Sequence, residues 1–139
     1  MWIFDTTFII DLINSDPGAI NKAKEIDESP SLKAISVITV QEYLRGIYYL
    51  FSKDEKILNE KLRRAEKELS NFEILPIDYS IAKIAAEIDA KLLMNGTPVD
   101  TADVLIAATA IKYDLTLVTR NVRDFEKIKK VKELKIETY

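Results

Sequence analysis

Four short stretches of the chain carry polar side chains that could bind a metal ion or move a proton. They contain Asp5, Glu42, the pair Asp100 and Asp103, and the run Thr119-Arg120-Asn121 followed by Asp124. The chain has 139 residues and contains neither His nor Cys. This composition excludes imidazole and thiolate metal ligands, disulfides and a Ser-His-Asp arrangement. Any hydrolytic chemistry must therefore rest on carboxylates, assisted by Lys, Tyr or a bound metal ion.

Phosphodiester hydrolysis is a reaction that would explain why carboxylates gather. It needs an activated water and shielding of the charge that develops on the phosphate, and Mg²⁺ or Mn²⁺ supplies both. These hard cations prefer oxygen ligands, so an acidic cluster is the metal cage that this composition allows. The formal net charge of −3 argues against a protein that coats phosphates with basic side chains. It is compatible with a metallonuclease, because bound cations reverse the local sign of the potential.

Asp103 is the most informative of these residues. On a helix, its same-face neighbours are Ile106, Ala107 and Ala110, so its carboxylate would face inward. An unpaired charge is costly there, and a metal ion is one way to compensate it. The alternative is that Asp100 caps the helix and Asp103 is the third residue of a capping-box-like start. The helix alone favours neither interpretation.

The other candidates also have structural alternatives. Asp5 could cap the helix that follows it. Glu42 could pair with Arg45 three residues on, and Thr119 and Asn121 could be ordinary loop residues. Their joint placement near the carboxyl ends of predicted strands is better evidence for a site than any one residue.

Short apolar runs that alternate with helical patterns predict the elements that position these side chains. We expect strands at 2–4, 34–37, 72–75, 116–118 and 134–136. We expect helices at about 8–13, from the Asp16-Pro17-Gly18 break to about Glu28, from 40 into the low fifties, and at 54–70, 78–93 and 100–113. This alternation predicts an α/β fold with a mainly parallel sheet of four to five strands. In such sheets, sites form outside the carboxyl ends of the strands.

The composition, with 47% hydrophobic and 31% charged residues, is that of a globular protein. No repeat or linker divides it, so we expect one domain over residues 1–139. The N-terminal residues lack the features of a signal peptide, and no apolar run approaches membrane-spanning length. With the absence of Cys, these features favour a cytoplasmic protein without a membrane partner.

At these same residues the chain resembles the PIN-domain family, and within it the VapC-type toxins of prokaryotic toxin–antitoxin pairs. The matching segments are FDTTFIIDL at 4–12, ITVQEYLRG at 38–46, DVLIAATA at 103–110, and LVTRN at 117–121 leading to Phe125. Together, in this order, they span nearly the whole chain. The resemblance implies a three-layer α/β/α fold, dependence on Mg²⁺ or Mn²⁺ and endoribonuclease activity. It also implies a homodimer and a cognate antitoxin that wraps the toxin and blocks its site.

The resemblance also assigns roles to residues. The acidic positions of the family fall on Asp5, Glu42 and Asp103. The family often has a further Asp where this chain has Asn121, whose carbonyl could serve instead, or for which Asp124 or Asp100 could compensate. Thr119 matches a hydroxyl position that orients the site.

The sequence therefore predicts a metal-dependent endoribonuclease that hydrolyses RNA with an activated water and without a covalent intermediate. Arg45 or Arg120 could contact phosphate, or either could form a surface ion pair. One alternative is an aspartyl-nucleophile phosphatase that starts at Asp5. We discount it because such enzymes usually carry a second Asp two residues on, where this chain has Thr7. Another alternative is a non-catalytic, receiver-like module with an acidic metal pocket.

The helix expected at 54–70 predicts a partner surface. It has an apolar line at Leu58, Leu62, Ala65 and Leu69, and the helix before it carries more apolar side chains than one core-facing stripe needs. We expect the line to pack partly on the preceding helix. The leftover apolar surface would form a groove between the two helices for an antitoxin helix or a second copy.

Overall fold

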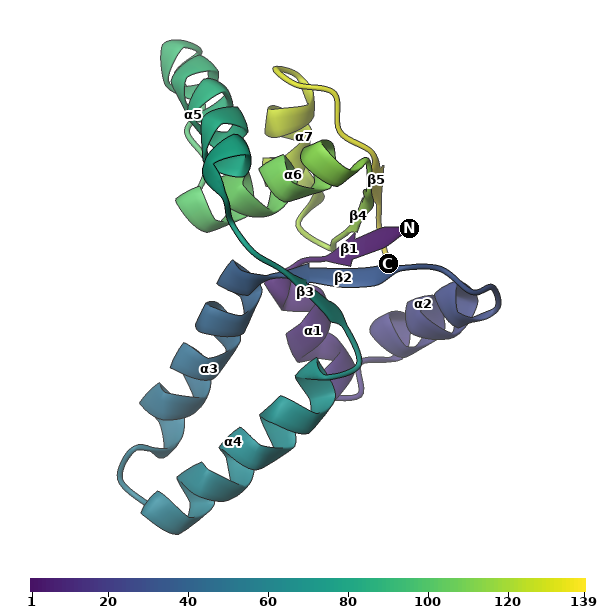
Figure 1. The fold of residues 1–139 in the computed structure, drawn as a ribbon, viewed down its shortest axis with the longest axis vertical. Helices are drawn as coiled ribbons and strands as arrows, with labels where there is room; N and C mark the ends of the chain where they lie inside the picture. The colour runs from purple at the N-terminus through teal and green to yellow at the C-terminus, as the bar shows by residue number, and fades with distance from the viewer.

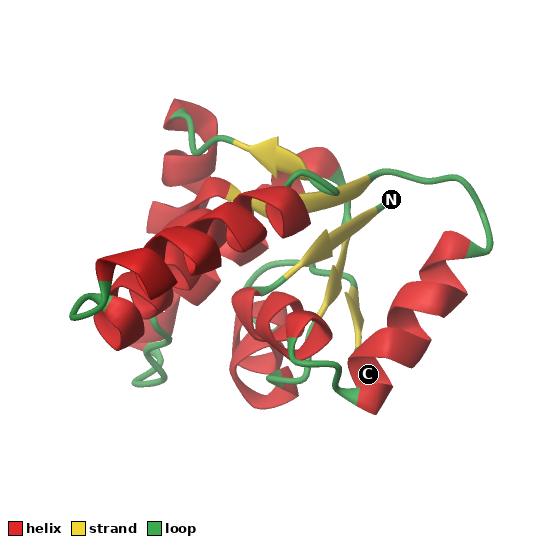
Figure 2. Ribbon diagram, turned by 90° about the horizontal axis from the view of Figure 1, so that it is seen from below, coloured by secondary structure: helices red, strands yellow, loops and turns green.

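The computed structural model describes residues 1–139 and contains one five-stranded, fully parallel sheet. The strands are β1 (Trp2–Phe4), β2 (Lys33–Ser36), β3 (Glu73–Leu75), β4 (Thr116–Val118) and β5 (Ile136–Glu137). Their order across the sheet is β3-β2-β1-β4-β5, which places β1 at the centre. Figure 2 shows the strands as a twisted fan with helices on both sides. The predicted α/β class is confirmed.

Seven helices connect and cover the strands (Figure 1). They are α1 (Thr6–Ile13), α2 (Pro17–Asp27), α3 (Val37–Phe51), α4 (Glu55–Leu69), α5 (Tyr79–Met94), α6 (Thr101–Tyr113) and α7 (Val122–Lys129). No helix is long and apolar enough to cross a membrane.

Successive strand residues face opposite sides of the sheet, and this alternation builds two separate cores. Ile3 and Leu117 lie in a core with side chains of α5, α6 and α7. Phe4 and Val118 lie in the other core, with side chains of α1, α2 and α4. The helices therefore form one layer on each face, and the expected three-layer α/β/α arrangement is confirmed (Figure 1).

Most predicted elements are present, and the errors have local causes. Val37 was expected in the second strand but is the first residue of α3, because Ser36 ends the strand and caps the helix by accepting the N–H of Ile38. The last strand begins at Ile136, two residues later than expected, whereas Leu134 is buried in the core as part of the preceding loop. Helix α7 was not among the predicted elements; it is short and charged and is held by the buried Phe125 and Ile128.

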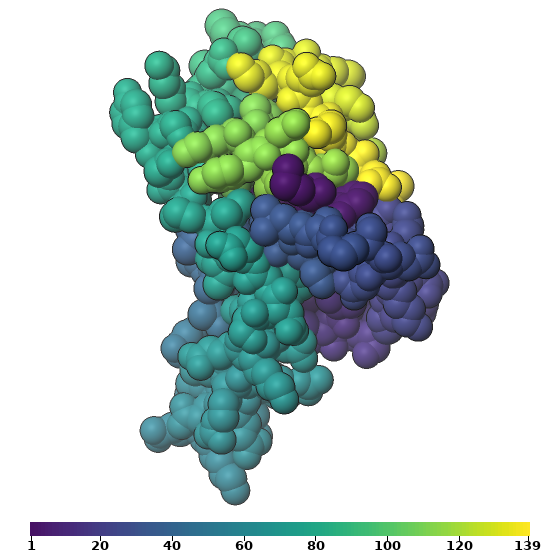
Figure 3. Space-filling model, turned by 45° about the vertical axis from the view of Figure 1, so that its right-hand side comes forward, coloured from purple at the N-terminus to yellow at the C-terminus, as the bar shows by residue number.

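Helices α3 and α4 form a hairpin that projects away from the sheet (Figures 1 and 3). The apolar line of α4 is buried at one end, where Ala65 and Leu69 lie inside the protein, and half-buried at Leu58 and Leu62. The expected packing of this line within the chain is therefore confirmed. Tyr49 and Leu50 of α3 remain exposed.

Candidate active site

Asp5 and Thr119 lie side by side because of the strand register. Phe4 and Val118 are the last residues of β1 and β4, and they are partners across the sheet. The backbone N–H of Asp5 donates to the carbonyl oxygen of Val118, at 3.3 Å. The residues that follow these two strands therefore meet at one edge of the sheet, as the rule for parallel sheets predicts.

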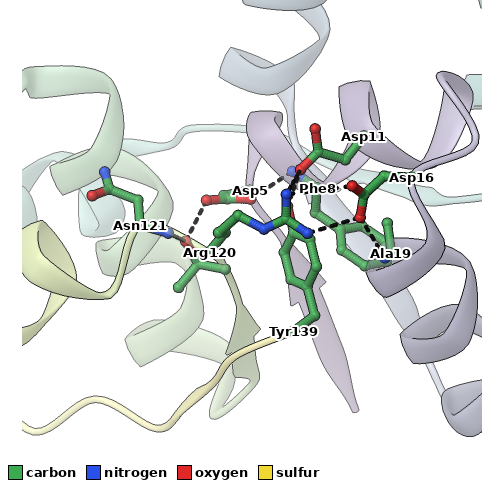
Figure 4. Close-up of polar contacts among 9 residues, drawn as sticks. Asp5, Phe8, Asp11, Asp16, Ala19, Arg120, Asn121 and Tyr139 are labelled. Atoms are coloured by element: carbon green, nitrogen blue, oxygen red, sulfur yellow. Dashed lines mark hydrogen bonds and ion pairs between the residues drawn. The ribbon is translucent and has the colours of Figure 1, made fainter.

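The carboxylate of Asp5 is held by two hydrogen bonds. Its Oδ1 accepts the backbone N–H of Phe8 at 2.9 Å, and its Oδ2 accepts the hydroxyl of Thr119 at 2.5 Å. Thr119 Oγ1 in turn accepts the backbone N–H of Asn121 at 2.9 Å (Figure 4). Asp5 is only 3% exposed. The capping alternative for Asp5 is therefore correct, and the same side chain also belongs to the acidic cluster described below.

Glu42 is held by hydroxyl groups. The hydroxyl of Thr6 donates to Glu42 Oε1 at 2.7 Å and lies 3.1 Å from the hydroxyl of the fully buried Thr39. The alternative in which Glu42 pairs with Arg45 is wrong, since Arg45 is exposed and forms no ion pair. Sequence reasoning missed Thr6, whose role depends on how α1 and α3 pack.

Electrostatics shows that Asp103 shares a region with the other carboxylates. The pKa of Asp103 is raised to about 7, chiefly by burial and then by the charges of Asp100, Asp5, Glu42 and Asp124 in that order. Burial likewise raises the pKa of Asp5 to about 6, against the effect of its two hydrogen bonds. Asp103 and these four neighbours are thus close enough for their charges to interact, and we call the five carboxylates the acidic cluster.

Asp100 does not act as the expected helix cap. It occupies the N-cap position of α6, but its exposed side chain accepts no capping hydrogen bond. The capping-box interpretation of Asp100 and Asp103 is therefore wrong. Neither carboxylate accepts a hydrogen bond from the chain. This strengthens the case that both belong to the acidic cluster.

Asn121 and Asp124 lie at the start of α7. Asn121 is the N-cap residue, and its Nδ2 donates to Asp124 Oδ2 at 3.1 Å. Asp124 also forms an ion pair with Lys127, at 3.6 Å. These contacts hold Asp124 on its own helix, although its charge still reaches Asp103.

The donor set fits a hard cation. Asp5, Glu42, Asp100 and Asp103 take part in no ion pair, so their mutual repulsion is not offset by Lys or Arg. No three carboxylates are arranged around one point as a finished ion cage. They share a region, and carboxylate, hydroxyl and amide oxygens are the ligands that Mg²⁺ and Mn²⁺ select.

Arg120 forms no ion pair with the carboxylates of the acidic cluster. Its guanidinium pairs with Asp16 at 2.7 Å and with Asp11 at 3.4 Å, and it lies over the ring of Tyr139 (Figure 4). Of the two roles considered for Arg120, the structure shows the ion pair. Sequence reasoning missed Asp11, Asp16 and Tyr139, because no local pattern indicates a contact between residues more than 100 positions apart.

Comparisons with known proteins find a matching family model and named relatives. The family model described as PIN domain matches residues 2–131. The chain is 35% identical to Ribonuclease VapC1 of Methanocaldococcus jannaschii over 127 residues, which cover 91% of this chain and 80% of that protein. It is 33% identical to the tRNA(fMet)-specific endonuclease VapC of Salmonella typhimurium, with 91% of each chain covered.

A solved structure has the same fold. It is VapBC2 from Rickettsia felis, bound to a DNA fragment from its promoter. The similarity covers 99% of this chain and 98% of the matched chain, with a TM-score of 0.82 and 25% sequence identity.

The raised pKa of Asp103 predicts a pH-dependent stability of the metal-free protein. The folded state holds this proton more tightly than the unfolded state, so stability falls as the pH rises from about 4 to about 7 and then stays low. In excess chelator, Asp103→Asn should therefore raise the melting temperature at about pH 8 and change it little at about pH 4. The expected rise is roughly 2–4 °C for each kcal/mol recovered.

Calorimetric melting at both pH values would measure this effect. Asp89→Asn, which removes a half-buried carboxylate of α5 outside the acidic cluster, is the matched control. Equal shifts for both variants, or a shift that does not depend on pH, would show that Asp103 carries no special electrostatic cost.

Proposed function

The chain belongs to the PIN-domain family, and from this premise we propose that it is a metal-dependent endoribonuclease and the toxin of a toxin–antitoxin pair. The observation that carries the proposal is the set of three carboxylates, Asp5, Glu42 and Asp103, that approach one another without a compensating cation from the chain. The names of the relatives give the reaction class, hydrolysis of RNA. We place this activity in the cytoplasm.

Asp5, Glu42 and Asp103 would hold Mg²⁺ or Mn²⁺, with Asn121, Asp100 and Asp124 as further candidates. When bound, such a cation neutralises phosphate charge and activates water. Thr119 fixes Asp5 in one rotamer through its hydroxyl, and Thr6 does the same for Glu42. Preorganised ligands of this kind lose less freedom when the ion and the substrate bind.

The geometry disfavours Asp5 as a phosphate-accepting nucleophile. Both of its oxygens already accept a hydrogen bond, and the residue is almost fully buried. A nucleophile must bring an oxygen into bonding distance of the phosphorus atom. A metal ion is less demanding, because it can use the remaining lone pair of a hydrogen-bonded carboxylate oxygen or an intervening water. The absence of Asp at position 7 points the same way.

We propose that an antitoxin helix binds in a groove between α1, α3 and α4. The groove has a volume of about 300 Å³ and is lined on its apolar side by Ile10, Ile13, Tyr43, Ile47, Leu50 and Phe51. Lys61 and Arg64 of α4 form its basic rim. The expected groove is thus present, but Leu58 and Leu62 do not line it. An amphipathic helix with acidic flanking residues would fit this surface. Exposed apolar side chains elsewhere would serve a homodimer.

Loss of any of the three carboxylates tests the proposed reaction. Asp5→Asn, Glu42→Gln and Asp103→Asn should each lower RNA cleavage by more than about 100-fold while the fold persists, because these carboxylates are the proposed ligands of the ion, directly or through water. Glu60→Gln, which changes an exposed carboxylate of α4, should leave activity unchanged.

Chelation of divalent cations should stop cleavage by the unaltered protein, and added Mg²⁺ or Mn²⁺ should restore it. Full cleavage in excess chelator would exclude this mechanism.

Asn121→Asp tests the position where the chain differs from its family. A carboxylate is a stronger ligand for a hard cation than an amide, so the variant should bind Mn²⁺ about tenfold more tightly. Titration calorimetry measures this affinity, with Asn95→Asp at the end of α5 as a control. An unchanged affinity would mean that Asn121 does not contact the ion.

Leu50→Asp tests the proposed groove. Leu50 is 70% exposed, so the charge should not unfold the protein, but it would stand in the apolar contact. Association with the proposed cognate antitoxin should weaken by roughly tenfold or more, with RNA cleavage by the free protein unchanged. Leu93→Asp, at a 68% exposed position of α5 outside the groove, is the matched control. If sedimentation equilibrium finds both variants bound normally, the antitoxin surface lies elsewhere.

A further inference from the structure

Arg120 stands between two site residues in the sequence, yet its side chain turns away from them. Figure 4 shows it reaching from the segment of Asn121 toward Asp11 and Asp16. Its Nη2 donates to Asp16 Oδ2 at 2.7 Å, and its Nη1 lies 3.4 Å from Asp11 Oδ2. Arg120 therefore ties the loop after β4 to the end of α1 and the start of α2.

Tyr139 contacts both Asp11 and Arg120. Its hydroxyl donates to Asp11 Oδ2 at 2.7 Å, and its ring lies 4.6 Å from the Arg120 guanidinium carbon. Burial and the hydrogen bond to Asp11 raise the pKa of Tyr139 well above its usual value, so the hydroxyl stays a donor. We call Arg120, Asp11, Asp16 and Tyr139 the Arg120 clamp.

The clamp adjoins both partners of the hydrogen bond between Thr119 and Asp5, Thr119 through the chain and Asp5 through Phe8. On one side, the Tyr139 ring packs edge-on against Phe8, with centroids 5.0 Å apart, and the N–H of Phe8 holds Asp5 Oδ1. On the other side, Arg120 is joined to Thr119 by the peptide bond. The C-terminal strand adds a third contact, because the N–H of Thr119 donates to the carbonyl oxygen of Glu137 at 3.0 Å.

The space around the clamp is tight. A Cβ at Gly18 would lie 3.1 Å from Arg120 Nη2 and 3.2 Å from Asp16 Oδ2. A side chain at position 18 would therefore press on the ion pair of Arg120 with Asp16. Glu137 is itself fixed by an ion pair with the buried Lys22, at 2.9 Å. Glu137 and Tyr139 also lie beyond residue 131, where the match to the family model ends.

We propose that Tyr139 and Arg120 are positioning residues for the cleavage reaction, which hold the loop after β4 so that the Thr119 hydroxyl stays on Asp5. This inference rests on the proposed function. Arg120 is 46% exposed, and exposed ion pairs contribute little to stability. The value of the clamp therefore lies in the geometry of Thr119 rather than in the stability of the fold.

Tyr139→Phe removes the hydroxyl of the clamp and keeps the ring. It should lower kcat about 3- to 10-fold, toward the lower end of what groups that orient metal ligands contribute. The KM for RNA should not change, and the affinity for Mn²⁺, measured by calorimetry without RNA, should fall by a similar factor. Tyr113→Phe, on the partly exposed end of α6, is the matched control and should alter neither quantity.

Arg120→Gln and Arg120→Lys separate positioning from a direct phosphate contact. Lys keeps the positive charge but cannot bond Asp16 and Asp11 through a planar fork while it covers the Tyr139 ring. Positioning predicts that both variants lower kcat and Mn²⁺ affinity without a change in KM. A phosphate contact predicts that Gln raises KM, that Lys restores it, and that Mn²⁺ affinity is unaffected; this result would overturn the proposal.

A purely structural role would also overturn it. In that case Tyr139→Phe would lower the melting temperature and leave kcat and Mn²⁺ affinity equal to those of Tyr113→Phe. Different results would reject the positioning role and the proposed function. Cleavage that survives in Asp103→Asn rejects the function, and the Mn²⁺ titrations then still decide whether the clamp positions the site.

Discussion

The carboxylate of Asp5 is buried at the carboxyl end of the central strand, and the surrounding structure offsets only part of the cost of a charge in that place. Two donors reach it, the N–H of Phe8 and the hydroxyl of Thr119, and neither brings a positive charge. Desolvation therefore still raises its pKa to about 6. An enzyme that must bind a cation benefits from this incomplete compensation, because a Lys or Arg beside Asp5 would offset the charge that attracts the ion.

The strand order decides which residues can meet at Asp5. Since β1 lies between β2 and β4, the segments that follow all three strands converge on one edge of the sheet. Glu42 arrives with α3 after β2, and Thr119 arrives directly after β4. Two hydroxyl groups, on Thr6 and Thr119, then fix the carboxylates. Side chains more than 100 positions apart thus become neighbours through backbone pairing, without long side chains that would have to reach across open space.

The sequence predicts the elements of this arrangement better than the contacts between them. Apolar periodicity predicts the strand at 2–4 and the helix at 54–70, because a local pattern reflects burial on one face. The small apolar helix face of Asp103 indicates an inward-facing carboxylate, and the structure has this side chain partly buried with a raised pKa. The ion pair of Glu42 with Arg45, which the sequence allowed as an alternative, does not form, since packing of α1 against α3 offers Glu42 the hydroxyl of Thr6 instead. The contacts of Arg120 with Asp16 and of Tyr139 with Asp11 depend on tertiary folding alone.

The capping role of Asp5 has a consequence for how the gene could lose its activity. Asn offers the same capping oxygen as Asp, so a single-base change of Asp5 to Asn preserves the start of α1. It also preserves Ile10 and Ile13, which belong to that helix and line the groove beside α3. Under the proposed function the Asp5→Asn product is inactive, and in a cell with two copies of the gene it would still occupy any partner that the groove binds. Such an allele would act as a decoy, and its phenotype would depend on copy number rather than on activity alone.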